Sequence, residues 1–160
     1  MNTIKFQLEH VEPLPNSSSH ELAKAVLSRF GLVPRKKDGT AKFERLLLEL
    51  YERKKTANKE HKPEAAVMPV EDMGIFSGIA RQTMYEYLKR WVGLGILKKT
   101  SFVANGKVII GYELNGNNLE GAFSKASTII RNHTDASMEI IKNLQLEIKK
   151  EKLRSKESTT

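Results

Sequence analysis

The chain has 160 residues, a formal net charge of +8 and 39% hydrophobic residues, which suits one domain of moderate size with extensions. The absence of cysteine excludes disulfides, thiolate metal sites and cysteine nucleophiles. No apolar run reaches the ~18 residues that span a bilayer, and the first residues lack the features of a signal peptide, so we expect no membrane partner and a cytoplasmic, nucleoid-associated protein.

The positive charge is distributed unevenly along the chain. Residues 29–62 and 78–107 are strongly basic, residues 63–77 are acidic, and the C-terminal region mixes both signs. A basic excess on particular segments favours a polyanionic partner such as nucleic acid. The alternative is a basic protein whose lysines are simply solvated, and charge alone does not separate the two.

Residues 1–16 are predicted to form an N-terminal strand or arm. Ile4, Phe6 and Leu8 alternate with polar residues, which is the pattern of a half-buried strand. Such a strand would pair with the hairpin predicted below or reach a partner subunit, unless this end of the chain is disordered.

A first helix is predicted to open at residues 17–19. Ser18 followed by Glu21 forms a capping box, in which the serine oxygen accepts a hydrogen bond from a first-turn N–H. Gly31 and Pro34 would end this helix. The side chains expected to pack on the main domain are Leu22, Ala25, Val26, Arg29 and Phe30.

A second helix is predicted from residue 41 to about residue 56. It follows a basic loop at 35–39, which is either a solvated connector or a contact for phosphate. Thr40 would cap the helix, and the cations at 53–55 would suit its C-terminus, where they offset the helix dipole. A loop is predicted at 58–67. The apolar stripe expected in the core comprises Phe43, Leu46, Leu47, Leu50 and Tyr51.

Two short helices joined by a tight turn are predicted next. The first covers residues 70–77, with Pro69 in its first turn, and Gly78 supplies the turn because glycine tolerates a positive φ. The second covers residues 80–92 and ends at Gly93 and Gly95. Spacings of three and four residues place the apolar side chains of each helix on one side: Val70, Met73 and Phe76 in the first, and Met84, Leu88, Trp91 and Val92 in the second.

A β-hairpin is predicted to follow the second of these helices. Residues 96–103 and 108–114 have the composition of strands, and Asn105-Gly106 lies between them. Because both central residues of a two-residue hairpin turn need a positive φ, this dipeptide is a strong hairpin signal.

The helix pair and hairpin resemble the winged helix-turn-helix superfamily of DNA-binding transcription regulators. The resemblance implies a mainly α fold with a small β-hairpin wing, an α+β class, in which the second helix enters the major groove and the wing contacts the DNA backbone or minor groove. One departure is Ala80, where a capping Ser or Thr is usual. The resemblance rests on residues 78–85 (Gly-Ile-Ala-Arg-Gln-Thr-Met-Tyr), on Leu88, Trp91 and residues 95–99 (Gly-Ile-Leu-Lys-Lys), and on the hairpin.

The resemblance also assigns candidate DNA contacts. Arg81 and Gln82 would read base edges, since Arg can bond guanine and Gln adenine through two hydrogen bonds. Glu86 would repel phosphate, so it either accepts from a cytosine amine or orients Arg81 or Lys89. The alternative is an ordinary solvated helix surface. Further contacts, to phosphate or a thymine methyl, are expected from Thr83, Tyr85 and Lys89, and contacts to phosphate from Lys98, Lys99, Asn105, Gly106 and Lys107 of the wing.

A long C-terminal helix is predicted from about residue 119 to residue 154. Its apolar stripe alternates spacings of three and four residues, as in a heptad seam, and at ~1.5 Å per residue it would extend over ~50 Å. We expect this stripe to pair with the same helix of a second copy, the alternative being a bent helix that folds back on its own domain. The expected dimer residues are Leu119, Ala122, Ala126, Ile129, Ile130, His133, Ser137, Ile140, Ile141, Leu144 and Ile148.

No enzymatic constellation is recognisable in the sequence. The four histidines, at positions 10, 20, 61 and 133, are scattered, and none has metal-ligand spacing to another His or to a carboxylate motif. A glycine-rich phosphate-binding loop is also missing from the sequence. We therefore expect no catalytic residue, no metal and no cofactor; whether a small-molecule effector binds is open.

The sequence as a whole predicts a homodimeric transcription regulator that binds double-stranded DNA specifically. Residues 17–116 would form the winged helix-turn-helix domain, residues 117–154 the coiled-coil-like dimerisation helix and residues 155–160 a flexible tail. Two alternatives use the same fold. One is a DNA-organising or plasmid-maintenance (partition) protein without sequence preference. The other is a protein–protein interaction module in a larger assembly.

Overall fold

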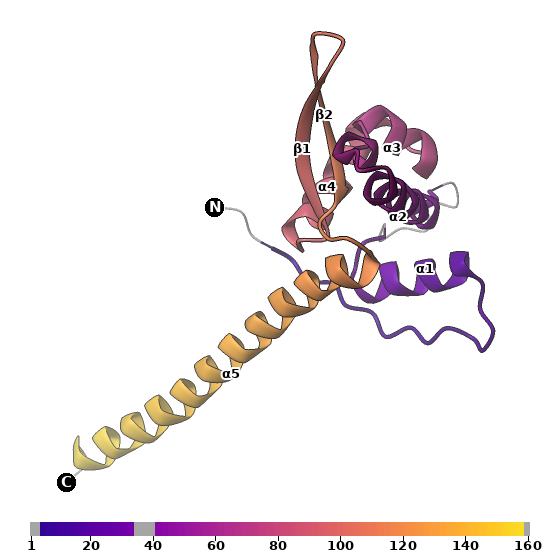
Figure 1. Cartoon of the computed structure of the whole chain (residues 1–160). Helices are drawn as coiled ribbons and strands as arrows, with labels where there is room; N and C mark the ends of the chain where they lie inside the picture. Colours follow the sequence, from indigo (N-terminus) through magenta and orange to yellow (C-terminus); the bar gives the residue numbers. More distant parts are fainter. Residues whose placement is uncertain (1–3, 34–40, 159–160) are drawn as a thin grey trace. The chain divides into compact units, whose positions relative to one another are not determined.

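The computed structural model describes residues 4–33 and 41–158 of the chain (Figure 1). The basic loop predicted at 35–39 and the cap predicted at Thr40 lie outside these residues. The chain divides into two compact units, Met1–Ala126 and Ser127–Thr160. Within the described residues the elements are α1 (Ser19–Arg29), α2 (Phe43–Glu60), the 3-10 turn η1 (Pro63–Ala66), α3 (Val70–Ser77), α4 (Arg81–Gly93), β1 (Leu97–Ala104), β2 (Lys107–Leu114) and α5 (Leu119–Ser158).

The strand predicted at residues 4–8 does not form. This segment is irregular and is held by side chains: Arg90 Nη1 donates to Gln7 Oε1 at 3.1 Å, and Arg29 Nη1 donates to the carbonyl of Val11 at 2.7 Å. A strand needs a neighbouring strand for its backbone hydrogen bonds, and this segment pairs with none among the described residues. The alternating pattern was therefore misleading, since Ile4 and Leu8 are both exposed.

Helix α1 begins where the sequence predicts, and it buries Ala25 as expected but only part of the predicted side. The Oγ of Ser18, the N-cap residue, accepts a hydrogen bond from the Glu21 amide at 3.2 Å, which confirms the predicted cap. The predicted packing side was wrong in part, because Leu22 is 50% exposed while Ala23 and Leu27 are buried. Both sets have helical spacing, and the contact of α1 with α2 selects the one that contains Leu27.

Helix α2 supplies the centre of the core and is longer than predicted. Four residues of the predicted stripe are buried, and the fifth, Tyr51, is partly exposed. The helix continues past Thr56 to Glu60 and ends at His61 in the left-handed conformation, with a φ of 55°. Ala57 is buried on the extra turn, so packing sustains the helix beyond the basic residues that were expected to end it. The four buried members of the stripe are Phe43, Leu46, Leu47 and Leu50.

Helices α3 and α4 form the predicted helix–turn–helix arrangement of elements. Gly78 ends α3 with a φ of 71°, and its amide donates to the carbonyl of Gly74 at 2.8 Å. The turn passes so close to α3 that a Cβ added to Gly74 would lie 2.8 Å from the carbonyl oxygen of Ile79. Both glycines are therefore needed for the reversal of the chain.

The core side of α4 is predicted correctly except at its end. Met84, Leu88 and Trp91 are buried, and Trp91 Nε1 donates to the carbonyl of Leu32 at 3.3 Å. Val92 was expected in the core but is 38% exposed. It follows Trp91 by one residue, which turns its side chain ~100° away from the buried indole.

Strands β1 and β2 form the predicted hairpin. Their antiparallel register pairs Leu97 with Leu114 at one end and Ala104 with Lys107 at the other. The positive φ values of Asn105 and Gly106, 52° and 74°, confirm the predicted turn. Figure 1 shows the hairpin extending beyond α3, with its turn as the free end.

A short backbone bridge fixes the hairpin to the segment that opens α3. The Met68 amide donates to the Tyr112 carbonyl at 2.8 Å, and the Tyr112 amide donates to the Met68 carbonyl at 2.9 Å. The chains meet closely here, since a Cβ added to Gly111 would lie 2.5 Å from the Met68 oxygen. Only glycine permits this approach, so Gly111 couples the hairpin to the helix pair.

The first turns of α5 belong to the first unit, which extends to Ala126. Ala122 and Ala126 are fully buried within the single chain, and Phe123 packs edge-on against Phe30 with ring centroids 5.1 Å apart. Ala122 and Ala126 therefore cannot serve the predicted dimer contact, and the partly buried Leu119 lies on the same turns. Their small size serves close packing inside the first unit instead.

The second unit is the remainder of α5, a single helix. Ile140, Ile141, Leu144 and Ile148 are all exposed there, because one helix offers no second layer against which they could pack. In residues 4–33 and 41–158, none of the helices combines the length and apolar character needed to cross a membrane.

The close approach at Gly111 leads to a prediction about stability. Gly111→Ala should lower the free energy of unfolding by ~1–3 kcal/mol, because the new methyl group would push Met68 out of its bridge. Gly93→Ala is the matched control, since nothing lies within 4 Å of a Cβ at that position. Thermal unfolding of both variants measures the effect, and equal melting temperatures for the two would contradict it.

Candidate nucleic-acid interface

The polar residues predicted on α4 lie together on its exposed side. Met84, Leu88 and Trp91 fix the orientation of the helix by burying its other side. All the predicted contact residues are exposed, so the structure presents them to solvent as a group. We call this surface the outer face of α4; it comprises Arg81, Gln82, Thr83, Tyr85, Glu86 and Lys89.

Arg81 is held by two neighbours. Its Nη1 lies 2.9 Å from Glu71 Oε1 on α3, and its Nη2 donates to the Tyr85 hydroxyl at 3.5 Å. The guanidinium carbon also lies 5.9 Å from the centre of the Tyr85 ring, which permits a cation–π contact. The Tyr85 hydroxyl, followed by the Glu71 carboxylate, raises the pKa of Arg81 above its ordinary value. The side chain is therefore a positioned, permanently charged donor.

Glu71 is the residue of this surface that sequence analysis missed. The sequence indicated only that residues 63–77 are acidic; in the structure Glu71 and Asp72 lie in the first turn of α3, where carboxylates suit the helix dipole. Glu71 and Arg81 are ten positions apart and meet because the tight turn brings the first turns of α3 and α4 together. Glu86 was considered as a carboxylate partner for Arg81, but the contacts described for Arg81 go to Glu71 and Tyr85.

The hairpin lysines divide between two faces and the tip. Neighbouring residues of a strand point to opposite sides, so Lys98 and Lys99 cannot meet the same surface. Lys98 Nζ lies 3.4 Å from Glu113 Oε1, whereas Lys99 lies opposite Tyr112 in the register. The predicted tip residues Asn105, Gly106 and Lys107 are all exposed at the free end of the hairpin.

Tyr112 links the Lys99 face of the hairpin to α4. Burial, and then the neighbouring Tyr85, raises the pKa of the Tyr112 hydroxyl above its ordinary value. Tyr85 on the outer face of α4 and Tyr112 on β2 are therefore close enough to interact. Lys99 lies beside Tyr112 on one face of the hairpin, and Lys98 lies beside Glu113 on the opposite face.

The far half of the hairpin is apolar. Val103 and Val108 are paired across the strands, Ile110 lies two residues further along the same face, and all three are exposed. Lys107 is the nearby cation of the tip. This patch was not expected for a wing whose assigned contacts are to phosphate, and it offers a surface for apolar contact.

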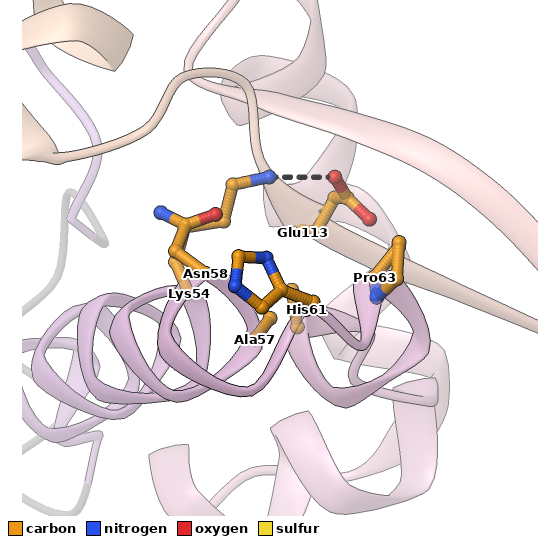
Figure 2. Close-up of a pocket in the computed structure, with 7 residues that line it drawn as sticks. Lys54, Ala57, Asn58, His61, Pro63 and Glu113 are labelled. Atoms are coloured by element: carbon orange, nitrogen blue, oxygen red, sulfur yellow. Dashed lines mark hydrogen bonds and ion pairs between the residues drawn. The ribbon is translucent and has the colours of Figure 1, made fainter.

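A pocket of about 340 Å³ lies between α2, η1 and β2 (Figure 2). Figure 2 shows Lys54 of α2 and Glu113 of β2 directed toward each other, and their Nζ and Oε1 atoms are 2.8 Å apart. This ion pair satisfies the two charges that a ligand would otherwise meet. In the part of the chain that the structure describes, no group of three or more His, Asp or Glu side chains is arranged to hold a metal ion. The other lining residues are Ala57, Asn58, His61, Pro63 and Ala66.

Comparisons of the chain with protein families, with curated proteins and with solved structures gave no match.

The Lys54–Glu113 ion pair that lines the pocket predicts how much each of its residues contributes to the free energy of unfolding. Glu113→Gln should cost about 3 kcal/mol, because it leaves the largely buried Lys54 ammonium without a counter-charge. Lys54→Met should cost less, since Lys98 remains beside Glu113, and Lys98→Met, at a half-exposed cation, should cost under ~1 kcal/mol. Urea unfolding of the three variants tests this order, and equal losses for the two lysines would refute the assignment.

Proposed function

We propose that this chain is a sequence-specific double-stranded DNA-binding protein of the winged helix-turn-helix type, acting as a homodimeric transcription regulator. Helix α4 lies in the major groove in this proposal, and the hairpin contacts the adjacent backbone. The first unit carries the DNA contacts, and the second unit joins two copies.

The observation that carries the proposal is the outer face of α4. Its first turn offers Arg81 and Gln82, the side-chain types that make paired hydrogen bonds to guanine and adenine. The N-terminal residues of a recognition helix are those that approach base edges, and this end of α4 is set by the tight turn at Gly78. Every member of the face is exposed, so the helix could enter a groove without rearrangement of the core.

The hairpin supports the same docking. The Met68–Tyr112 bridge ties it to the start of α3. A rigid hairpin beside the recognition helix would add contacts from Lys99 and Lys107 to phosphate, which position the protein without reading sequence. Lys98 faces Glu113 and would contribute less.

Dimerisation is assigned to the exposed stripe of the second unit. Residues 141, 144 and 148 follow the spacing of three and four that places apolar side chains along one seam. Two helices paired through this seam would bury Ile141, Leu144 and Ile148. A two-fold dimer binds half-sites about 34 Å apart, so the expected operator has inverted symmetry. Partly buried or exposed members of the predicted seam that remain candidates are Ile129, Ile130, His133, Ser137 and Ile140.

A protein–protein interaction module is the second candidate. The exposed apolar patch of Val103, Val108 and Ile110 favours it, because such patches often mark contacts with other proteins. A DNA-organising protein without sequence preference is a further alternative. Selection of bound sequences from a random duplex pool separates these functions, since a regulator should prefer its site by ~10³-fold or more.

Two substitutions test the division between reading and holding DNA. Arg81→Ala should relax the base preference at one position of the selected site, at a cost of ~1–3 kcal/mol in binding. Lys107→Ala should weaken binding to all duplexes alike and reduce the salt slope by ~1. Gel-shift titrations at several salt concentrations measure both effects. If both variants bind DNA like the parent protein, neither the outer face of α4 nor the wing tip is part of the DNA interface.

The proposed dimer seam has a matched control on the same helix. Leu144 and Leu146 are 56% and 53% exposed, but two residues along a helix turn the side chain to the other side. Leu144→Asp should weaken self-association ~100-fold by placing an unpaired charge in the seam, whereas Leu146→Asp should leave it unchanged. Sedimentation equilibrium measures both. A monomeric parent, or equal effects of the two changes, would contradict the seam.

A further inference from the structure

The charges around the outer face of α4 nearly cancel. Arg81 and Lys89 contribute two cations, while Glu86 and the neighbouring Glu71 contribute two carboxylates. A helix that only gripped phosphate would gain from an unpaired cation at its leading end. The leading cation here is instead paired at 2.9 Å with a carboxylate from another helix.

The pairing changes what Arg81 can offer. A guanidinium has five N–H donors, and the contacts to Glu71 and Tyr85 engage its two terminal nitrogens without exhausting them. The nearby carboxylate offsets the positive charge, which reduces the attraction for phosphate. The remaining donors stay available for a base edge, where hydrogen bonds rather than net charge give the discrimination.

The contacts also restrict the conformation of a long side chain. Glu71 holds the guanidinium from α3, and the Tyr85 ring and hydroxyl hold it from the next turn of α4. A side chain that is positioned before binding loses less conformational freedom when it meets its target. The side chains of this pair are 62% and 56% exposed, and because Glu71 belongs to a different helix, the contact relates Arg81 to α3 as well as to α4.

We propose that Glu71 is a specificity-determining positioning residue, which holds Arg81 for base recognition and suppresses its contribution to non-specific phosphate binding. The proposal rests on the proposed DNA-binding function and deepens it. It predicts that removal of the Glu71 charge makes binding less selective, with tighter binding to unrelated DNA.

Glu71→Gln tests this on the full-length protein, with the selected duplex and an unrelated duplex of equal length as probes. Unrelated DNA should bind several-fold more tightly, the salt slope should steepen by about one ion, and the ratio of the two affinities should fall about tenfold. In an Arg81→Ala background, Glu71→Gln should have little further effect, because the two residues act through one contact.

Asp72→Asn is the matched control. It removes the same charge from the next residue of α3, and Asp72 lies 3.9 Å from Arg53 in a different ion pair. Thermal unfolding verifies that both variants are folded. Identical behaviour of Glu71→Gln and Asp72→Asn on both duplexes would overturn the inference, as would equal weakening on both by Glu71→Gln alone. A parent that binds duplex DNA without preference, or not at all, would instead overturn the proposed function on which the inference depends.

Discussion

The backbone bridge between Met68 and Tyr112 is the contact on which the first unit depends. It is the backbone contact that joins the hairpin to the start of α3, and it adds to the ion pair between Lys54 and Glu113 that joins β2 to α2. The bridge joins the start of α3, the base of β2 and, through the neighbouring Glu113, Lys54 of α2. Three elements distant in sequence are thereby fixed together, while burial of Met84, Leu88 and Trp91 sets the orientation of α4 beside them.

Short sequence motifs correctly predicted the caps and turns whose conformation depends on one or two residues. Ser18 caps α1, Gly78 reverses the chain and Asn105-Gly106 closes the hairpin, each because a single residue or dipeptide supplies the conformation required. The length of α2 was not predictable in the same way. Its last turns persist because Ala57 is buried by tertiary packing, which a scan of neighbouring residues does not reveal.

In the candidate site, too, features set by helical spacing were predictable, whereas contacts between elements were not. Exposure of Arg81 and Gln82 follows from the helical spacing of Met84, Leu88 and Trp91, so the sequence was sufficient to identify the outer face of α4. The partner of Arg81 could not be found from helical spacing, because Glu71 lies on another helix across the turn. Lys98 and Lys99 were predicted together as phosphate contacts; strand alternation places them on opposite faces, and their different surroundings depend on the positions of Glu113 and Tyr112.

Helix α5 has residues 119–126 in the first unit and residues 127–158 in the second. One periodic apolar pattern runs through both parts, although only the first part is buried within the chain. Ala122 and Ala126 continue the spacing of the exposed residues that follow, yet they are buried in the first unit. Periodicity identifies an apolar side of a helix and does not identify what covers it. The buried part of the stripe carries the small residues Ala122 and Ala126, and the exposed part carries large aliphatic residues such as Ile141 and Leu144.

The close backbone approaches at Gly74 and Gly111 bear on how this sequence can diverge. A side chain at either position would collide with a carbonyl oxygen, whereas the outer face of α4 tolerates many residues without harm to the fold. Under the proposed function, a different target would require exchange of Arg81 or Gln82, whereas the fold requires these two glycines. Gly74 and Gly111 would therefore persist among relatives that share this fold, while the exposed residues of the outer face of α4 would differ between relatives with different targets.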